Sequence, residues 1–335
     1  MFVQILIHVD DRGQVGEARR AAVEIANTLG FLDTAAANVA LAVTETATNL
    51  VKHAGGGAIL LRPLQRDGIG GIELLALDRG PGMNVATSLR DGHSTSGSMG
   101  TGLGALSRLS NAMQVYSQPG HGTVLWLEFW ATSPTLRGTP GLQVAGICLP
   151  KSGEVVSGDA WGVECKGGYC NVLVADGLGH GSDAARAARA AVAVLTAHPE
   201  SEPGDLLPRA HGALATTRGA AVAAARFKIG EGRGKFAGIG NIAARIESAS
   251  TRRQLASHNG IVGHSMRKVQ EFPFDLPPGA VFILHSDGLS SHWTLADHPG
   301  LMAKHPAIIA GLLYRDHSRG RDDVTVVVIK IGEGA

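Results

Sequence analysis

The sequence has little net charge and no run of basic residues. Its 30 Lys and Arg nearly balance its 29 Asp and Glu, which leaves a formal net charge of +1. Proteins that bind nucleic acid or an anionic membrane surface usually carry a basic patch. We therefore expect no nucleic-acid partner and no membrane partner, and proteins or small anions instead.

The chain also lacks a long apolar run. Its most apolar segment, "AARAARAAVAVLTA", is broken by Arg186 and Arg189, whereas a membrane span needs ~18 or more apolar residues. The start "MFVQILIHVDD" has no basic stretch and soon meets two acids, which predicts a first strand rather than a signal peptide. These features favour a soluble, cytoplasmic protein.

Cysteine is scarce. Cys148, Cys165 and Cys170 form an odd set without CxxC spacing, and the histidines are too scattered to complete a zinc site. The pattern predicts reduced, mostly buried thiols, which fits the cytoplasm.

What the chain does have is apolar material for two cores: 335 residues, 44% of them apolar. Ser, Thr, Pro and Gly cluster in "ATSPTLRGTPG", which predicts a boundary there. We expect a first domain over residues 1–130, a linker over 131–141 and a second domain over 142–333.

The first part shows helical spacing of apolar residues from Val15 to Leu29 and again from Val39 to Val51, with Asp33 or Thr34 available to cap the second helix. Strands "AILLR" and "GIELLALD" follow, then a helix carrying Leu103, Leu106, Leu109 and Met113, then strands that end at Trp130. This order predicts an α+β sandwich with an antiparallel sheet.

The second part predicts sheets packed on each other with helices outside, again α+β. Its expected strands lie around residues 144–149, 170–175, 220–228, 235–239, 281–286 and 324–329. Its expected helices cover 182–197, 206–215 and 306–314.

A candidate nucleotide site begins on the second helix. Glu45 and Asn49 are four residues apart and share a face, which His53 continues. A carboxylate beside an amide can activate a hydroxyl and hold Mg²⁺, although taken alone the pair also fits a solvated helix face.

Glycine-rich motifs follow it. In "LDRGPGM", Asp78 ends a strand and Gly80 and Gly82 allow the backbone to approach a planar ring, or the segment is a plain turn. "GHSTSGSMGTGLGALSRLSN" opens into a helix, as phosphate-binding loops do, where the alternative is a linker. "GHGT" precedes the last strand. The candidate residues in these last two motifs are Gly100, Gly102, Gly104 and Thr123.

In this order, these motifs resemble the GHKL ATPase fold over residues 1–130, and within it the RsbT-type switch serine kinase of bacterial stressosomes. No helix pair with a phosphoacceptor histidine, which a histidine kinase needs, precedes them. The resemblance implies that the domain binds ATP and Mg²⁺. It also implies that Glu45 is the general base, that Asn49 binds Mg²⁺ and that Asp78 reads adenine.

A second candidate site consists of acidic turns. They are "VSGDAWG" with Asp159, "VADGLGHG" with Asp176, "LHSDGLS" with Asp287, and "GRDDVTVVVI" with Asp322 and Asp323. One Asp-Gly alone is usually a turn. Several carboxylates at strand ends, however, are the oxygen ligands that Mg²⁺ and Mn²⁺ prefer.

These turns, with "GLGHG", "TRGAAVAAARF", "GIGN" and "HNGIVG", resemble PPM-type serine/threonine phosphatases of the SpoIIE/RsbX branch over residues 141–333. The resemblance implies two Mn²⁺ or Mg²⁺ ions bridged by Asp176 and held also by the Gly177 carbonyl, Asp159 and Asp287. By the family's Asp-Asn pattern the last ligand is Asp322, with Asp323 in place of Asn, and the choice between the two stays open.

Two further residues have open roles. His180 either donates a proton to the leaving alkoxide or packs in its loop. Lys151 is a weak candidate for a phosphate clamp.

Together the two resemblances imply a bifunctional partner-switching regulator, a Ser/Thr kinase fused to a metal-dependent phosphatase. Its partners would be STAS-domain phosphoproteins of a stressosome-like module. One alternative is a phosphatase gated by a non-catalytic, ATP-sensing first domain. Another is an anti-sigma-like protein-binding clamp fused to a phosphatase.

Overall fold

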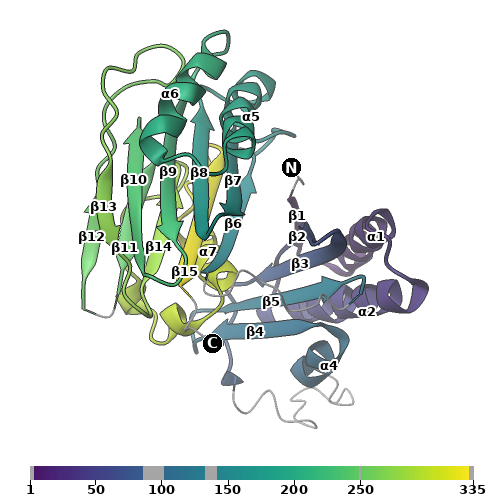
Figure 1. Ribbon diagram of the computed structural model, residues 1–335. Coiled ribbons are helices and arrows are strands. Elements are labelled where there is room, and N and C mark those ends of the chain that lie inside the picture. Colours follow the sequence, from purple (N-terminus) through teal and green to yellow (C-terminus); the bar gives the residue numbers. More distant parts are fainter. Residues whose placement is uncertain (1–3, 86–101, 133–141, 249, 332–335) are drawn as a thin grey trace. The chain divides into compact units, whose positions relative to one another are not determined.

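The computed structural model describes residues 4–85, 102–132, 142–248 and 250–331. The chain divides into two compact units, Met1–Arg137 and Gly138–Ala335. Each unit has its own hydrophobic core and its own sheets (Figure 1).

The first unit is an antiparallel five-stranded sheet with helices on one face. The strand order is β1-β2-β3-β5-β4, and apolar residues from α1, α2 and α4 share one core with one face of the sheet. The elements are β1 (Ile5–Val9), α1 (Arg12–Thr28), α2 (Asp33–Asn49), the π-helical turn η1 (Leu50–Ala54), β2 (Gly57–Arg66), β3 (Ile69–Leu77), α4 (Gly102–Leu109), β4 (Ala112–Ser117) and β5 (Thr123–Trp130).

The two long helices begin differently. The Asp11 side chain caps α1 by accepting from the amides of Gly13 and Gln14, and the Gln14 side chain reaches back to complete a capping box. Helix α2 follows Leu32, which has no side-chain cap. The prediction that Asp33 or Thr34 caps this helix is therefore wrong. Asp33 instead lies in the first turn, where a carboxylate interacts favourably with the helix dipole.

The prediction that one helix extends to Met113 is also wrong. Helix α4 ends at Leu109, and Met113 lies in β4 opposite Leu127. The chain leaves the helix because Asn111 is already tied to β5: its amide donates to Glu128 O, and its side-chain oxygen accepts from the Trp130 amide. Strand pairing overrides the helical spacing at this point.

The second unit has two antiparallel sheets with helices on both outer sides (Figure 1). The sheet orders are β13-β10-β9-β8-β7 and β12-β11-β14-β15-β6. The elements are β6 (Leu142–Leu149), β7 (Asp159–Lys166), β8 (Tyr169–Gly177), α5 (Ser182–Ala197), α6 (Pro203–Leu214), β9 (Ala220–Lys228), β10 (Arg233–Ile239), β11 (Ala243–Glu247), β12 (Arg252–Leu255), β13 (Phe272–Asp275), β14 (Val281–His285), η2 (Leu295–Asp297), η3 (Leu301–Ala303), α7 (Pro306–His317) and β15 (Val324–Ile331).

Two apolar clusters hold this unit together. One lies between the sheets and includes Phe227, Phe236, Phe282 and Val327. The other joins α5 and α6 to the outer face of the first sheet, while α7 packs on β6 and β15 of the second. Each sheet is therefore covered on both sides, and the predicted α+β class is confirmed.

Two cysteines differ from the prediction. Cys165 and Cys170 are register partners in the β7–β8 hairpin and form a disulfide. Cys148 on β6 is not part of a disulfide. Burial raises the pKa of this thiol to about 12, so it stays protonated.

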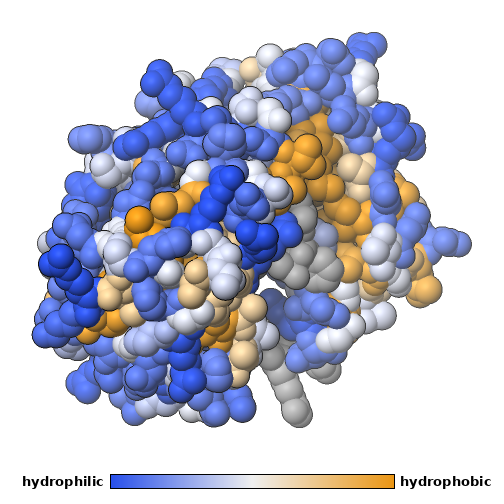
Figure 2. Space-filling view, turned by 90° about the horizontal axis from the view of Figure 1, so that it is seen from above, coloured by the Kyte–Doolittle hydropathy of each residue, from blue (hydrophilic) through white to orange (hydrophobic). Residues whose placement is uncertain are grey.

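No described helix combines the length and apolarity needed to cross a bilayer. On the face shown in Figure 2, hydrophilic residues predominate and apolar residues form separate patches.

Candidate functional sites

In the first unit, the structure brings Asp78 and Thr123 together at the ends of β3 and β5. Asp78 is buried, and its Oδ1 accepts from the amides of Gly80 at 2.9 Å and Thr123 at 3.2 Å. The Asp78 amide in turn donates to Thr123 O at 3.0 Å. The hydroxyls of Thr123 and Ser117 lie 3.0 Å apart. The carboxylate is thus held rigidly at the point predicted to face a base.

Gly82 has a structural reason to be glycine. Its φ of +67° lies in the left-handed region, and a Cβ there would overlap the carbonyl of Gln118. This close packing sets the path of the loop after Asp78.

The helix that carries Glu45 and Asn49 ends beside this loop. Both residues are half-buried on α2, one turn apart. The chain then enters η1, where an ideal Cβ on Gly80 would lie 2.6 Å from Ala54 Cα. A π-helical turn of this kind is frequent at functional sites. His53 lies exposed in η1.

The predicted glycine loop is only partly described. Gly102 and Gly104 lie in the first turn of α4. Gly100 lies outside the described residues, as does most of the loop before α4. Of the loop predicted to bind phosphate, the structure therefore describes only the part at the start of α4.

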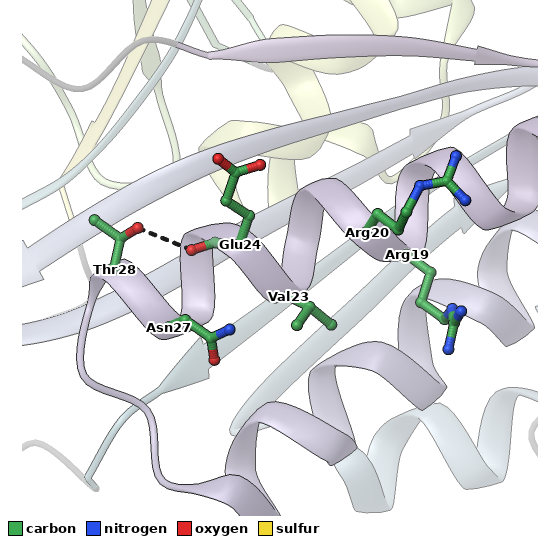
Figure 3. Close-up of a pocket in the computed structure, with 6 residues that line it drawn as sticks. All are labelled: Arg19, Arg20, Val23, Glu24, Asn27 and Thr28. Carbon is green, nitrogen blue, oxygen red and sulfur yellow. Dashed lines mark hydrogen bonds between the residues drawn. The ribbon is translucent and has the colours of Figure 1, made fainter.

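Two hollows lie near these helices. One of about 340 Å³ is lined by Arg12, Val15, Thr48, Val51 and Lys52, none of which is a predicted site residue. The other, of about 420 Å³, follows α1 and contains none of the predicted residues. A single helix supplies its described lining of Arg19, Arg20, Val23, Glu24, Asn27 and Thr28 (Figure 3).

In the second unit, four strands present carboxylates at one end of the two-sheet sandwich. Asp159 begins β7 opposite Asp176 near the end of β8. Asp287 follows β14, and Asp322 and Asp323 precede β15, which pairs with β14. Residues separated by more than 160 positions are thereby gathered into one cluster.

Ser286 links the two sheets within the cluster. Its hydroxyl donates to Asp159 Oδ2 at 2.6 Å, and its Oγ accepts from the Thr325 amide at 2.9 Å. Ser286 and Asp159 are both buried. This chain of hydrogen bonds fixes the orientation of the Asp159 carboxylate.

The other carboxylates have partners of their own. Asn241 donates through Nδ2 to Asp287 Oδ2 at 2.7 Å. The Lys151 amide donates to Asp323 Oδ1 at 2.8 Å, and the Asp323 amide donates to Asp322 Oδ1 at 2.9 Å. Asp323 is buried, whereas Asp322 is exposed.

The Asp176 carboxylate stands apart because no hydrogen bond from a described residue reaches it. Burial, followed by the negative charges of Asp159, Asp287, Asp322 and Asp323, raises the pKa of Asp176 to about 8. Burial also raises the pKa of Asp159 to about 7, against the lowering effect of the Ser286 hydrogen bond. Without a cation, therefore, the cluster is electrostatically unfavourable when ionised.

These residues fit a divalent metal ion. The donors are hard carboxylate oxygens, and the Asp176 carboxylate accepts no hydrogen bond from a described residue that would compete with a metal ion. The backbone of Gly177 packs directly against α5, where a Cβ would overlap the Ala184 carbonyl oxygen. Among the described residues no three His, Cys, Asp or Glu side chains converge closely enough to form an enclosed metal site.

His180 and Lys151 contact different carboxylates. His180 is half-exposed, and its Nδ1 lies 2.6 Å from Glu154 Oε1. Lys151 reaches the cluster through its backbone amide. Sequence reasoning missed Ser286 and Asn241. Ser286 could have been found as the hydroxyl residue directly before Asp287, and Asn241 as the amide residue in "GIGN".

Comparisons with known proteins find relatives for both units. A model of the histidine kinase-like ATPase domain matches residues 9–129. Serine/threonine-protein kinase RsbT of Bacillus subtilis (strain 168) is 30% identical over 128 residues, which are 38% of this chain and 96% of that protein. The chain belongs to the RsbT family through its first unit.

The second unit carries a SpoIIE domain. The model of stage II sporulation protein E matches residues 166–332. A solved chain described under "The bacterial stressosome: a modular system that has been adapted to control secondary messenger signaling" is 30% identical with a TM-score of 0.53, covering 56% of this chain and 99% of that one. RsbX in complex with magnesium shares the fold at 20% identity and a TM-score of 0.51, covering 57% and 96%. The chain is thus an RsbT-like ATPase domain joined to a PPM-type phosphatase domain.

Proposed function

We propose that this RsbT–SpoIIE fusion both adds phosphate to and removes phosphate from Ser or Thr residues of STAS-domain proteins in a stressosome-type module. The observation that carries the proposal is the carboxylate cluster at the strand ends of the second unit. The name of the RsbT relative, a serine/threonine-protein kinase, supports the added activity.

In the second unit, Asp159, Asp176, Asp287, Asp322 and the Gly177 carbonyl would hold two Mg²⁺ or Mn²⁺ ions. When bound, such ions supply a water of lowered pKa for in-line attack on phosphorus. Ser286 orients Asp159 and Asn241 orients Asp287. Asp323 anchors the Lys151 amide, which leaves the exposed Asp322 as the better-placed ligand of the two.

In the first unit, Asp78 would accept from the exocyclic amine of adenine, and Asn49 would hold Mg²⁺ with the phosphates of ATP. Glu45 would take the proton from the substrate hydroxyl. Positioning and metal electrostatics supply most of the rate in such phosphoryl transfers.

A paired labelling assay tests this proposal. The intact chain and an Asp176→Asn variant are each incubated with γ-labelled ATP and a STAS-domain acceptor. Label that accumulates on the acceptor with the variant, and is removed by the intact chain, supports both activities. A matched Glu45→Ala variant in the Asp176→Asn background should bind ATP without transferring label.

Two outcomes would replace the proposal with an alternative. If no variant transfers label while the intact chain still removes phosphate, the first unit is an ATP sensor that gates the phosphatase. Stable capture of a sigma factor or an antagonist, without transfer, would make it a binding clamp.

A further inference from the structure

The loop that follows Asp176 is joined to a second loop, which carries an arginine. Gly177 pairs with Ala220 across β8 and β9, and the Leu178 amide donates to Gly219 O at 3.0 Å. Arg218 therefore lies beside the segment that leaves the carboxylate cluster. A Cβ on Gly179 would lie 3.2 Å from an Arg218 terminal nitrogen.

The loop that carries Arg218 is held from several directions. Thr217 Oγ1 accepts from the Gly219 amide at 3.0 Å and donates to Leu214 O at 2.8 Å. The Ala220 amide donates to Val262 O at 3.0 Å, and His264 Nε2 lies 3.1 Å from Thr217 O. The backbone at Arg218 is thus fixed before any ligand arrives.

The guanidinium itself remains accessible. Its NH2 lies 3.0 Å from Asp183 Oδ2, and the two side chains are 52% and 46% exposed. A guanidinium has five N–H donors in a fork that matches the oxygens of a phosphate. A surface ion pair of this kind is weak, so a phosphate can displace Asp183 at little cost.

The negative charge of the carboxylate cluster favours a cation such as Arg218 beside the site. The five carboxylates of the cluster carry five negative charges when ionised, which exceed the four positive charges of two divalent ions. A phosphorylated side chain brings a further ~−1.5 to −2. A cation beside the metal ligands would offset part of the charge of the arriving substrate.

Other nearby cations are placed differently. Lys151 meets the cluster through its backbone amide, and His180 is paired with Glu154. Arg186 shares Asp183 with Arg218 at 3.6 Å, but it lies one turn along α5. Arg186 is consequently a matched control with the same charge and the same partner.

We propose that Arg218 is the phosphate-binding residue of the second unit and contacts the phosphoryl oxygens of a phosphoserine or phosphothreonine substrate. The proposal rests on the proposed phosphatase function. Asp183 holds the guanidinium in place until the phosphate takes over its hydrogen bonds.

The test uses the full chain with Mn²⁺ and compares Arg218→Ala, Arg218→Lys and Arg186→Ala with the unsubstituted protein. Steady-state kinetics with a phosphoserine peptide and with p-nitrophenyl phosphate separate kcat from KM. We expect Arg218→Ala to raise KM at least ~10-fold for both substrates and to weaken inhibition by inorganic phosphate to a similar extent. Arg218→Lys should recover part of the loss, and Arg186→Ala should stay within ~2-fold.

Three results would overturn the proposal. Unchanged KM and phosphate inhibition in Arg218→Ala would show that Arg218 does not bind the phosphate. A loss confined to the peptide would assign Arg218 to flanking residues of the substrate. An equal loss in Arg186→Ala would assign the effect to the Asp183 pair.

Calorimetric titration of inorganic phosphate into the Mn²⁺-loaded protein keeps this test separate from the proposed function. If the unsubstituted chain hydrolyses neither substrate, the phosphatase proposal fails. A weaker binding of phosphate by Arg218→Ala than by Arg186→Ala would still support the binding role, and equal binding would reject it.

Discussion

The two candidate sites stabilise a buried carboxylate in opposite ways. Asp78 in the first unit accepts two backbone hydrogen bonds at 2.9 and 3.2 Å. Asp176 in the second unit receives none from the described residues and faces four other carboxylates. Backbone amides of the protein therefore stabilise the carboxylate of the first site, whereas the carboxylates of the second site need a cation to offset their mutual repulsion. This difference predicts that Asp176→Asn and Asp78→Ala will have opposite effects on stability.

The largest expected effect comes from Asp176→Asn. The variant should lose more phosphatase activity than the ~10–100-fold typical of outer-shell changes at metal sites. Its metal-free form should nevertheless unfold at a higher temperature than the unsubstituted chain at pH 8, because the substitution removes a repelled negative charge. Phosphate release and thermal unfolding, measured on the same preparation, check both parts. A metal-free variant that is less stable than the unsubstituted chain at pH 8 would contradict this account.

Asp78→Ala should do the reverse. It leaves the amides of Gly80 and Thr123 without their acceptor, which costs ~1–3 kcal/mol of folding free energy. Nucleotide binding should weaken at the same time. Calorimetry with a non-hydrolysable ATP analogue and urea unfolding provide the measurements.

The control for this variant is Asp78→Asn. It keeps an oxygen acceptor for the two amides but not the negative charge. If Asp78 reads adenine, Asp78→Asn should retain most of the stability and still bind the nucleotide less tightly. Equal nucleotide affinity in all three proteins would remove Asp78 from the site.

The sequence predicted the contrast only in part. The acidic turns identified Asp159, Asp176 and Asp287 as a group, because each has a glycine neighbour and because Asp176 and Asp287 each follow a predicted apolar strand. The sequence pattern did not indicate which of these carboxylates would accept hydrogen bonds. That depends on contacts such as Ser286 to Asp159, which join residues 127 positions apart.

Two of the strands that the sequence did not predict, β7 and β11, lack the apolar pattern of a typical strand. β7 ("DAWGVECK") has mostly polar or partly exposed positions after Ala160. β11 buries Arg245 and Glu247, although charged residues in a sequence usually indicate an exposed segment. In the structure Arg245 donates to Ser291 O and Trp293 O and lies over the Trp293 ring. Contacts with residues distant in the sequence stabilise these segments as strands, and the local sequence pattern does not contain that information.

A smaller loss of metal binding or activity is expected from a substitution at Ser286, which orients Asp159 but not Asp176. Ser286→Ala removes the hydroxyl that orients Asp159 and should weaken metal binding or activity by ~10–100-fold. Ser290→Ala serves as a nearby control, since Ser290 lies beyond the buried cluster. The Mn²⁺ dependence of turnover distinguishes the two. A Ser286→Ala variant that saturates with Mn²⁺ as the unsubstituted chain does would show that Asp159 needs no such support.

The smallest expected effect is a pH dependence of stability in the metal-free second unit. The pKa of Asp159 is raised to about 7 and that of Asp176 to about 8, whereas an unfolded chain has Asp at ~3.9. The folded state therefore retains protons that the unfolded state has released. Stability from this pair falls as pH rises from about 4 to about 8, where the carboxylates finally ionise. Mn²⁺ offsets the repulsion, so it should raise the unfolding temperature by several degrees more at pH 8 than at pH 6. The Asp176→Asn variant should show a flatter pH profile without metal, and an unchanged profile would mean that the cluster does not carry this charge.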